Sequence, residues 1–281
     1  MIKRTLYFGN PVRLFKKDKQ LKIEFLQKDR PPSTVPIEDI GIILLDHYNI
    51  QITHASISAL QQNNTAIVSC NEKHHPHGIM LPFYGHTEFT EKLRHQIKAS
   101  QPLKKNLWQQ TVVMKIKNQA ALLNQQNIEA DNMLTWARKV KSGDPDNYEA
   151  RAAAYYWDKL FEIPGFKRFR YGEAPNNLLN YGYAVLRAVI ARSLVGSGLL
   201  PALGIQHSNR YNPFCLVDDV MEPYRPYVDQ LVLDIMGTQT DIEELTPALK
   251  KSLLAIPVLD IEISGKKSPL MVGCQQTTAS L

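Results

Sequence analysis

The chain has 281 residues, 44% of them hydrophobic and 21% charged, which excludes a disordered or low-complexity polymer and predicts about two domains with a substantial core. Its three cysteines are widely spaced and form no CxxC pair, so neither a disulfide framework nor a structural zinc site is expected. No segment resembles a signal peptide or reaches the roughly 18 apolar residues of a membrane span. We therefore expect a cytoplasmic protein.

The formal net charge of +6 is unevenly distributed along the chain. Counting Lys, Arg, Asp and Glu gives +2 for residues 1–89, +9 for residues 90–210 and −5 for residues 211–281. A basic middle followed by an acidic last quarter would suit a surface for a polyanion beside a site that holds cations. Ordinary solvated helix faces would give the same distribution, so charge alone does not decide between the two.

Short β-like segments fill the first 83 residues, separated by turn-forming groups such as Gly9-Asn10-Pro11. The predicted strands contain the sequences TLYF, VRLF, LKIEFL, IGIILL, IQIT and AIVSC. Residues 56–63 lack strict alternation and predict a short helix between two of these strands. Residues 71–78 are expected to form a loop, and its histidines are assigned no catalytic role.

After Gly85, apolar residues recur at intervals of three and four, which is the spacing of helices. The predicted helices cover residues 88–99, 102–124, 128–140, 147–161, 175–199, 224–236 and 241–255. The expected fold is therefore α+β, with a small N-terminal β-sheet domain of β-sandwich type at residues 1–85 and a larger all-α domain at residues 86–281. Residues 265–281 are polar and are expected to form a flexible tail.

Common phosphate-loop, dinucleotide-binding, esterase and zinc-protease motifs are missing, so chemistry is sought in two acidic segments. In the first segment, Asp146 or Asn147 can cap a helix that carries Glu149 in its first turn. Small residues follow and allow close helix contact, so an ionised Glu149 there would need a cation or hydrogen-bond donors. The alternative is an exposed glutamate that pairs with Arg151.

The second acidic segment combines a histidine with three carboxylates. His207 follows a predicted helix end, and Asn212 with the proline after it predicts the start of a new helix. That helix carries Asp218, Asp219 and Glu222, with Glu222 at a bend because a proline follows it. An imidazole, a carboxylate of this helix and the glutamate of the first segment would form a mixed nitrogen and oxygen site suited to Mn²⁺ or Mg²⁺. A lone histidine can equally be a structural residue.

Four motifs follow one another in an order and spacing typical of one protein family. They are NYEARAAAYYW at 147–157, PNNLLNYGYAVLR at 175–187, GIQH at 204–207 and FCLVDDVMEPYRP at 214–226. With these motifs the chain resembles the universal CRISPR-associated spacer integrases, the first-numbered family of the Cas series. The resemblance extends over the whole chain and is greatest to members from type II systems, which accompany single-protein RNA-guided effector nucleases.

The resemblance implies that Glu149, His207 and Glu222 are the catalytic metal ligands, with Asp219 as an auxiliary acid beside them. Many relatives have Asp at the position of Glu222, which leaves the exact coordination open. The implied reaction inserts short DNA fragments into a CRISPR array by attack of a 3′ hydroxyl on a phosphodiester at a repeat boundary, with Mg²⁺ or Mn²⁺ as cofactor. The implied partners are double-stranded DNA, a second copy of the chain, a small ferredoxin-like adaptation protein, and a type II accessory protein and effector nuclease.

Basic residues suggest where DNA would bind. Lys167, Arg168 and Arg170 alternate with aromatic residues, so cations could contact phosphates while rings stack on bases. The alternative is an ordinary loop whose rings belong to the core. Asn177 matches the family and is a further candidate contact, although it could simply cap a helix. A second candidate surface consists of Lys104, Lys105, Lys115 and Lys117.

Two other functions stay open at this level. One is a catalytically silent DNA-binding scaffold that organises the adaptation complex and uses its acidic residues only structurally. The other is a structure-specific repair nuclease that cleaves branched DNA without a partner protein.

Overall fold

The computed structural model describes residues 2–26, 30–83, 85–169, 172–239, 241–263 and 265–281. These residues form two compact units. The first unit joins residues 1–89 with 188–198 and 257–281, and the second joins residues 90–187 with 199–256. Each unit is thus built from separate pieces of chain, whereas the sequence predicted one boundary after residue 85.

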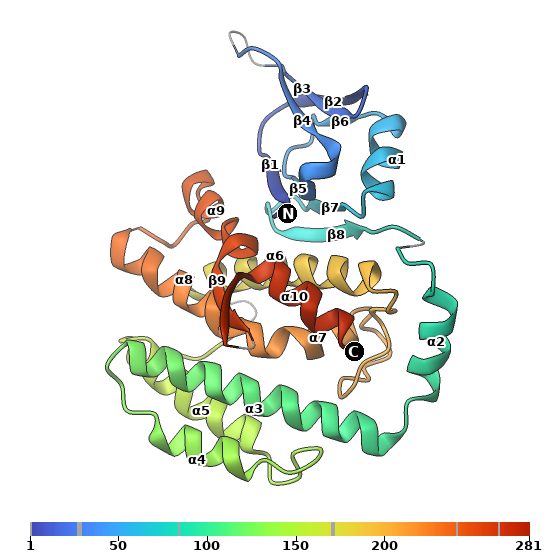
Figure 1. Ribbon diagram of the computed structural model, residues 1–281. Helices are drawn as coiled ribbons and strands as arrows, with labels where there is room; N and C mark the ends of the chain where they lie inside the picture. Colours follow the sequence, from blue (N-terminus) through green and yellow to red (C-terminus); the bar gives the residue numbers. More distant parts are fainter. Residues whose placement is uncertain (1, 27–29, 84, 170–171, 240, 264) are drawn as a thin grey trace. The chain divides into compact units, whose positions relative to one another are not determined.

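Two four-stranded sheets form the framework of the first unit (Figure 1). The strands and short helices of residues 4–80 are β1 (Arg4–Phe8), β2 (Val12–Lys17), β3 (Gln20–Phe25), β4 (Ser33–Pro36), η1 (Ile37–Asp39), β5 (Ile40–Leu45), β6 (Gln51–Ile52), α1 (His54–Gln62), β7 (Ala66–Cys70) and β8 (Pro76–Met80). One sheet has the order β1-β5-β7-β8, with β8 antiparallel to β7 and the other pairs parallel. The other has the order β4-β3-β2-β6, with only the β2–β6 pair parallel.

Both sheets contribute side chains to one apolar core. In β2, Val12 and Leu14 are buried while Arg13 between them is exposed, because successive residues of a strand point to opposite faces. Ile43 of β5 and Leu60 of α1 belong to the same buried cluster. The predicted sheet domain of β-sandwich type and its short helix are therefore confirmed, while β4 and β8 formed where turns and a loop were expected.

The end of the chain completes the first unit. Its elements are β9 (Asp260–Ile263), β10 (Lys266–Pro269) and α10 (Leu270–Ala279), with β9 and β10 antiparallel. Leu270 and Cys274 of α10 are fully buried, and the hydroxyl of Thr278 lies 2.9 Å from that of Ser197. The expectation of a flexible tail at residues 265–281 was thus wrong, because the few apolar residues of this segment lie on one buried face of α10.

The second unit consists of helices (Figure 1). They are α2 (Phe89–Lys98), α3 (Gln101–Gln125), α4 (Asp131–Lys139), α5 (Tyr148–Leu160), α6 (Asn176–Gly196), α7 (Cys215–Met221), η2 (Glu222–Tyr224), α8 (Arg225–Thr238), α9 (Pro247–Leu253) and η3 (Ile256–Val258). The predicted helices are confirmed to within a few residues, except that α9 is shorter. The first residue of α2, the last turns of α6 and the end of η3 are counted in the first unit.

The long helix α3 is the centre of the second unit. It contacts α4, α5, α7, η2 and α8. Trp108, Val112, Ile116 and Ala120 are buried on one of its faces, at the spacing of four residues that places side chains above one another along a helix. A sheet unit together with a helical unit confirms the predicted α+β class. None of the described helices combines the length and apolar character needed to cross a membrane.

The burial of α10 predicts the effect of a truncation in its first turn. We expect Leu270→Ala to lower the free energy of unfolding of the first unit by about 2–5 kcal/mol, because it opens a cavity in a packed core. Leu281→Ala, at a residue that is 43% exposed, serves as the control and should change it by less than about 0.5 kcal/mol. Urea unfolding measures both, and equal midpoints would show that α10 is not docked.

Candidate active site

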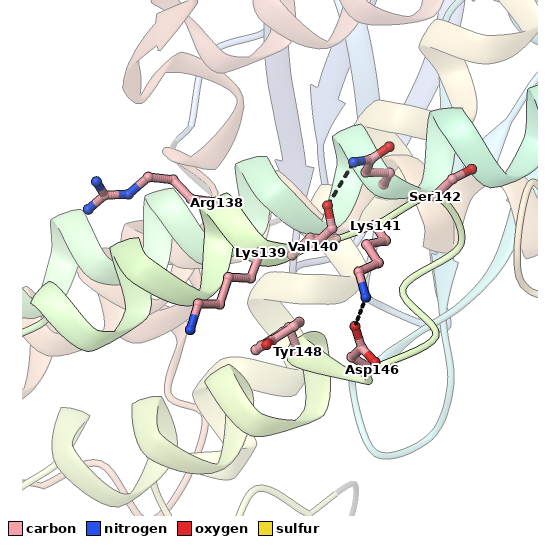
Figure 2. Close-up of a pocket in the computed structure, with 8 residues that line it drawn as sticks. Arg138, Lys139, Val140, Lys141, Ser142, Asp146 and Tyr148 are labelled. Carbon is pink, nitrogen blue, oxygen red and sulfur yellow. Dashed lines mark hydrogen bonds and ion pairs between the residues drawn. The ribbon is translucent and has the colours of Figure 1, made fainter.

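A basic cavity marks the approach to α5. It has a volume of about 560 Å³ and is lined by the end of α4, the segment that leads to α5, and Gln109 of α3 (Figure 2). Arg138, Lys139 and Lys141 are exposed around it, and the Lys141 ammonium lies 3.1 Å from the Asp146 carboxylate. Gln109 donates its amide to the backbone carbonyl that follows α4, at 2.7 Å. The net positive charge of this cavity suits phosphate groups.

The start of α5 places Glu149. The carboxylate of Asp144 accepts hydrogen bonds from the backbone N–H groups of Tyr148 and Glu149, both at 2.9 Å. These are donors that the first turn of a helix leaves unpaired. Asn147 adopts a left-handed conformation with φ of 53° and its side chain forms no capping bond. The expected cap at Asp146 or Asn147 was therefore wrong, and Asp144 caps the helix from further upstream.

Glu149 and Glu222 converge on one cation, Lys115. The Lys115 ammonium lies 2.7 Å from Oε1 of Glu149 and 2.7 Å from Oε2 of Glu222. The three side chains come from α5, η2 and α3, and their exposed fractions are 27% for Glu149, 7% for Glu222 and 11% for Lys115. The alternative in which Glu149 is exposed and paired with Arg151 does not describe this structure. The Arg151 guanidinium lies instead over the rings of Trp136 and Tyr148.

Glu222 stands at the bend that the sequence predicted. Helix α7 ends at Met221, and Glu222 opens the short 3-10 helix η2. Asn118 of α3 donates its side-chain amide to the carbonyl of Pro223 at 2.7 Å, which fixes η2 against α3. Arg225 adds an ion pair, with Nε 3.0 Å from Oε1 of Glu222.

Charge explains how the buried groups stay ionised. Burial opposes the ionised form of Glu222, but the charges of Arg225 and Lys115 outweigh it and lower the pKa of Glu222. Burial likewise opposes the charge of Lys115, and here the charges of Glu222 and Glu149 outweigh it and raise the pKa of Lys115. Each buried charge therefore depends on its neighbours.

Asp219 holds His207 and the loop that carries it. The Asp219 carboxylate is fully buried and accepts hydrogen bonds from the backbone N–H groups of Ile205, Gln206 and His207, at 2.6, 3.0 and 3.2 Å. Its Oδ1 atom also lies 2.6 Å from Nδ1 of His207. An ionised carboxylate only accepts hydrogen bonds, so Nδ1 carries the proton and Nε2 is the nitrogen left for other partners. This hydrogen bond, together with the charges of Asp219 and Glu222, outweighs burial and raises the pKa of His207.

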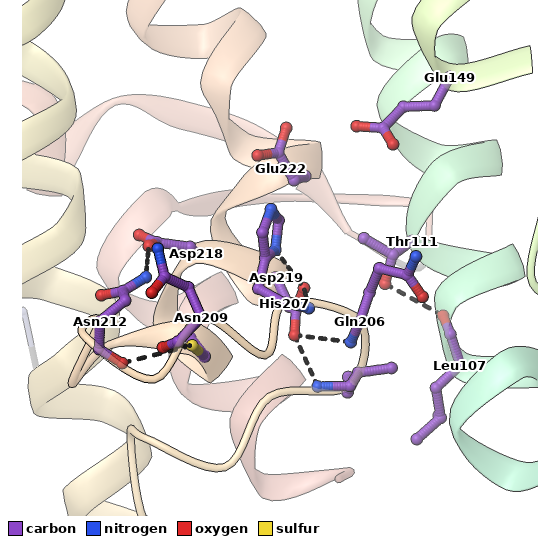
Figure 3. A network of polar contacts seen from close by, with 12 residues as sticks. Leu107, Thr111, Glu149, Gln206, His207, Asn209, Asn212, Asp218, Asp219 and Glu222 are labelled. Carbon is purple, nitrogen blue, oxygen red and sulfur yellow. Dashed lines mark hydrogen bonds and ion pairs between the residues drawn. The ribbon is translucent and has the colours of Figure 1, made fainter. Parts of the chain in front are cut away.

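The imidazole of His207 is the third group of the candidate site, beside the two glutamates. In Figure 3, the Glu149 carboxylate and the His207 ring are both directed toward Glu222. The ring of Trp108 on α3 packs edge-on against His207, with centroids 6.0 Å apart. Among the described residues, no three His, Cys, Asp or Glu side chains stand ready to hold a metal ion, and Lys115 occupies the place between the two glutamates. The donor set nevertheless fits Mn²⁺ or Mg²⁺. It consists of two carboxylates and an imidazole, and a third carboxylate orients the imidazole.

Asp218 faces away from this cluster. Its two carboxylate oxygens accept hydrogen bonds from Arg187 of α6, at 2.8 and 2.5 Å, and one of them also accepts from the Asn212 amide at 2.7 Å. Such a bidentate pair with Arg is a strong, oriented contact. Asp218 therefore attaches α7 to α6.

A fully buried carboxylate, Asp229 of α8, supports the site from behind. It accepts hydrogen bonds from the hydroxyls of Tyr156 on α5 and Tyr183 on α6, at 2.7 and 2.5 Å. Burial raises the pKa of Asp229 to about 6, although the two tyrosines and nearby arginines oppose the shift. The guanidinium of Arg225 lies over the Tyr183 ring, 4.7 Å from its centroid. Since Arg225 also pairs with Glu222, Tyr183 and Arg225 together link Asp229 to the candidate site.

Comparison with known proteins identifies the family. The family model described as CRISPR associated protein Cas1 matches residues 6–245. A CRISPR-associated endonuclease Cas1 from Neisseria meningitidis serogroup C (strain 8013) is 39% identical over 254 residues, which are 89% of this chain and 82% of that protein. The chain belongs to the Cas1 family. A CRISPR-associated endonuclease Cas1 2 from Pyrobaculum aerophilum is 27% identical over 259 residues and covers 88% of each chain.

Solved structures share the fold of this Cas1-family chain. A casposase bound to integration product superposes with a TM-score of 0.77 at 18% identity, covering 99% of this chain and 89% of the casposase. A Cas1 protein from Thermotoga maritima gives 0.70 at 18% identity and covers 98% of this chain and 89% of its own. A chain of a Cas6-RT-Cas1–Cas2 complex gives 0.73 at 18% identity, covering 99% of this chain and 34% of its own. At these identities the likeness shows the fold alone.

The predicted DNA-binding segment of the Cas1-family chain divides into different environments. Lys167 is exposed. The Arg168 guanidinium donates to Oδ1 of Asn176 at 3.0 Å and to Oδ1 of Asn180 at 2.6 Å, so it connects its segment to the start of α6. The ring of Phe166 packs edge-on against that of Phe161, as the alternative of a core-packed loop expected. Arg170 lies outside the described residues.

Asn177 has partners within the protein as well. Its amide nitrogen donates to the carbonyls of Ile242 and Glu243, at 2.7 and 2.9 Å, so it ties the start of α6 to the segment before α9. Contact of this residue with DNA stays a prediction.

Sequence reasoning missed the place of Lys115 and Arg225 in the candidate site. The sequence predicts a DNA-binding surface for Lys115, together with Lys104, Lys105 and Lys117. Its spacing held a signal, because Lys115 lies seven residues after Trp108 and three after Val112, both buried, which places it at the edge of the inward face. Arg225 lies three residues after Glu222, the spacing at which helical side chains meet.

The contact between Asp219 and His207 can be tested by titration. We expect Asp219→Asn to lower the pKa of the His207 imidazole in the metal-free protein, since the charged acceptor that stabilises the imidazolium is lost. NMR of the histidine ring nitrogens against pH measures the change. Asp218→Asn removes a charge one residue away that makes no bond to the ring, and it should lower the pKa less. An equal fall in both variants would contradict the specific contact.

Proposed function

We propose that this chain is a divalent-metal-dependent DNA integrase and endonuclease of CRISPR adaptation, which inserts short DNA fragments into a repeat array. The observation that carries the proposal is the convergence of Glu149 and Glu222 on one cation, beside an imidazole that Asp219 orients. These residues come from motifs far apart in the sequence, and a packed helical unit is what brings them together. Membership of the Cas1 family and the relatives named as endonucleases support the reaction class.

Glu149, Glu222 and His207 would hold the metal. A bound Mg²⁺ or Mn²⁺ would polarise a phosphodiester and stabilise the charge that develops as a 3′ hydroxyl displaces the leaving oxygen. The chain's own residues provide the frame: Asp219 keeps the proton of His207 on Nδ1, and Arg225 keeps Glu222 ionised and oriented. Trp108 limits the rotation of the imidazole by packing against its edge. The reaction transfers a phosphodiester bond between hydroxyls and needs no ATP, consistent with the missing phosphate-loop motif.

The partners we propose follow from the family and the relatives. One structural neighbour is described as a casposase bound to integration product and another as a complex containing Cas1 and Cas2. We infer that this chain acts as a homodimer on double-stranded DNA, together with a small ferredoxin-like adaptation protein and, in a type II system, an accessory protein and effector nuclease. The sheet unit would provide the dimer and partner contacts.

A catalytically silent scaffold is the second candidate function. The ion pairs of Lys115 with Glu149 and Glu222 favour the scaffold, because this cation already compensates part of the charge of the two carboxylates. The acidic cluster could then serve packing alone. The two functions differ in whether the carboxylates and the imidazole are needed for strand joining.

Strand joining by variants distinguishes the two functions. We expect Glu149→Ala and His207→Ala to abolish joining of a labelled short duplex into a supercoiled repeat-containing plasmid, with Mg²⁺ or Mn²⁺ and the small partner supplied, while DNA binding persists. Glu162→Ala removes an exposed carboxylate from the segment that follows α5 and should join DNA like wild type. Full activity of the first two variants would refute the proposed site and leave the scaffold. Efficient cleavage of branched DNA without the partner would instead indicate a repair nuclease.

The basic cavity predicts where part of the DNA backbone binds. We expect the double variant Arg138→Ser and Lys139→Ser to weaken DNA binding and to reduce the slope of log affinity against log salt by about 2, since each phosphate contact contributes roughly 0.9. Lys266→Ser with Lys267→Ser makes the same change of charge on exposed residues of β10 and serves as the control. Fluorescence anisotropy at several salt concentrations measures both slopes. An unchanged slope in the first variant would exclude the cavity as a DNA contact.

A further inference from the structure

Lys115 occupies the position that a metal ion would need. Its ammonium is bonded to one oxygen of Glu149 and one of Glu222, which the proposed function assigns as ligands. Both contacts are 2.7 Å, the length of a charge-assisted hydrogen bond. An ammonium at that distance from both oxygens fills the space between them, so a divalent ion and Lys115 cannot occupy it together.

The carboxylates need this cation when no metal is bound. Glu222 is 7% exposed and Glu149 27%, and two ionised carboxylates brought together in a partly buried place repel each other. Arg225 compensates part of the charge but contacts only Oε1 of Glu222, whereas Lys115 contacts Oε2. Lys115 is therefore the cation that joins Glu222 to Glu149, and through them η2 to α5.

The lysine side chain is suited to an exchange with metal. Its four-carbon stem is flexible and ends in a compact charge, so it can withdraw without a change in helix α3. In contrast, the Arg225 guanidinium lies over the Tyr183 ring, and this contact holds it in addition to its ion pair with Glu222. The two cations around Glu222 thus differ: one is fixed by an aromatic ring and the other is held by the two glutamates.

We propose that Lys115 is a built-in counter-ion that keeps Glu149 and Glu222 together in the metal-free protein and competes with the divalent ion for them, so that it sets the metal affinity of the site. This inference rests on the proposed function, because it assumes that the glutamates are metal ligands. Lys115 is a positioning residue in the metal-free state and is displaced when the ion binds. Its competition would keep the site free of metal until the ion concentration is high enough.

An ordinary structural ion pair makes the opposite prediction. If Lys115 only stabilised the fold, its loss would leave the glutamates less well placed and metal binding would weaken or stay the same. If Lys115 competes with the ion, its loss leaves a more negative site and metal binding tightens. The direction of the change in affinity therefore separates the two roles.

The test measures metal binding by the full-length, metal-free protein. Isothermal titration with MnCl₂ and with MgCl₂ is compared for wild type, Lys115→Met and Lys115→Arg. We expect Lys115→Met to lower the Kd for Mn²⁺ by about tenfold and Lys115→Arg, which keeps the charge, to leave it at or above the wild-type value. Lys117→Met removes an exposed lysine of the same helix and should bind Mn²⁺ like wild type.

Thermal unfolding provides a second readout. We expect Lys115→Met to melt at a lower temperature than wild type without metal. It should gain more on addition of Mn²⁺, because at a given concentration a more tightly bound ligand stabilises the folded state more. Circular dichroism checks that each variant is folded. Lys115→Gln, which can still donate to one carboxylate, replaces Lys115→Met if that variant does not fold.

The outcomes separate this inference from the function on which it rests. In one outcome, wild-type protein binds Mn²⁺, Glu149→Gln abolishes this binding, and a folded Lys115→Met binds Mn²⁺ no more tightly than wild type. This outcome would overturn the role of Lys115 as counter-ion and leave the metal site intact. Wild-type protein that binds neither Mn²⁺ nor Mg²⁺, with Lys115→Met equally inactive in binding, would overturn both. Tighter binding by Lys115→Met and also by Lys117→Met would refute the specific role of Lys115, since any lost lysine would then act through general charge.

Discussion

The candidate site depends on one constraint: two glutamates that lie close together and largely out of water must share a cation. The free energy of removing a carboxylate from water is recovered only when a positive charge or several donors meet it. Here Lys115 provides that charge from α3, and Arg225 provides more from the start of α8. Helices α3 and α5 and the bend at η2 can therefore meet only in an arrangement that brings these charges together.

The surrounding polar groups make this arrangement specific. Asp144 caps α5 so that Glu149 stands in its first turn, and Asn118 binds the carbonyl of Pro223 so that Glu222 faces α3. Behind them, Asp229 joins the hydroxyls of tyrosines on two helices. Each of these groups is paired, as buried polar groups are expected to be. Each one fixes the position of a helix and is not itself a candidate metal ligand. Apolar packing along α3 brings the helices together, and the polar pairs determine their register.

Much of the fold was accessible from the sequence because period and turn chemistry are local. Alternation in β2 and the three-and-four spacing of α3 directly reflect which side chains are buried. The hairpin of β9 and β10 and the helix α10 were missed because short, polar segments carry little periodicity, and their burial depends on contacts with distant residues. The left-handed Asn147 misled the assignment of the helix cap, since Asp144 reaches the same N–H groups from an earlier position.

For the candidate site, motifs pointed to Glu149, His207 and Glu222, while spacing could not show what lies between them. Lys115 belongs to no motif, and only the packing of three helices reveals its contacts. Conversely, Arg168 and Asn177 have the composition of DNA contacts but are used within the protein, because an exposed cation and one turned toward neighbouring amides look the same in a sequence.

The Asp219 carboxylate changes how inactive variants should be interpreted. It gathers three consecutive backbone N–H groups as well as the imidazole, so it organises the loop in the manner of an anion bound in a backbone nest. An alanine at this position would disorganise the loop and misplace His207 without removing any candidate ligand. Loss of catalysis on its own therefore does not distinguish an acid that would bind a metal ion from one that organises the loop carrying His207.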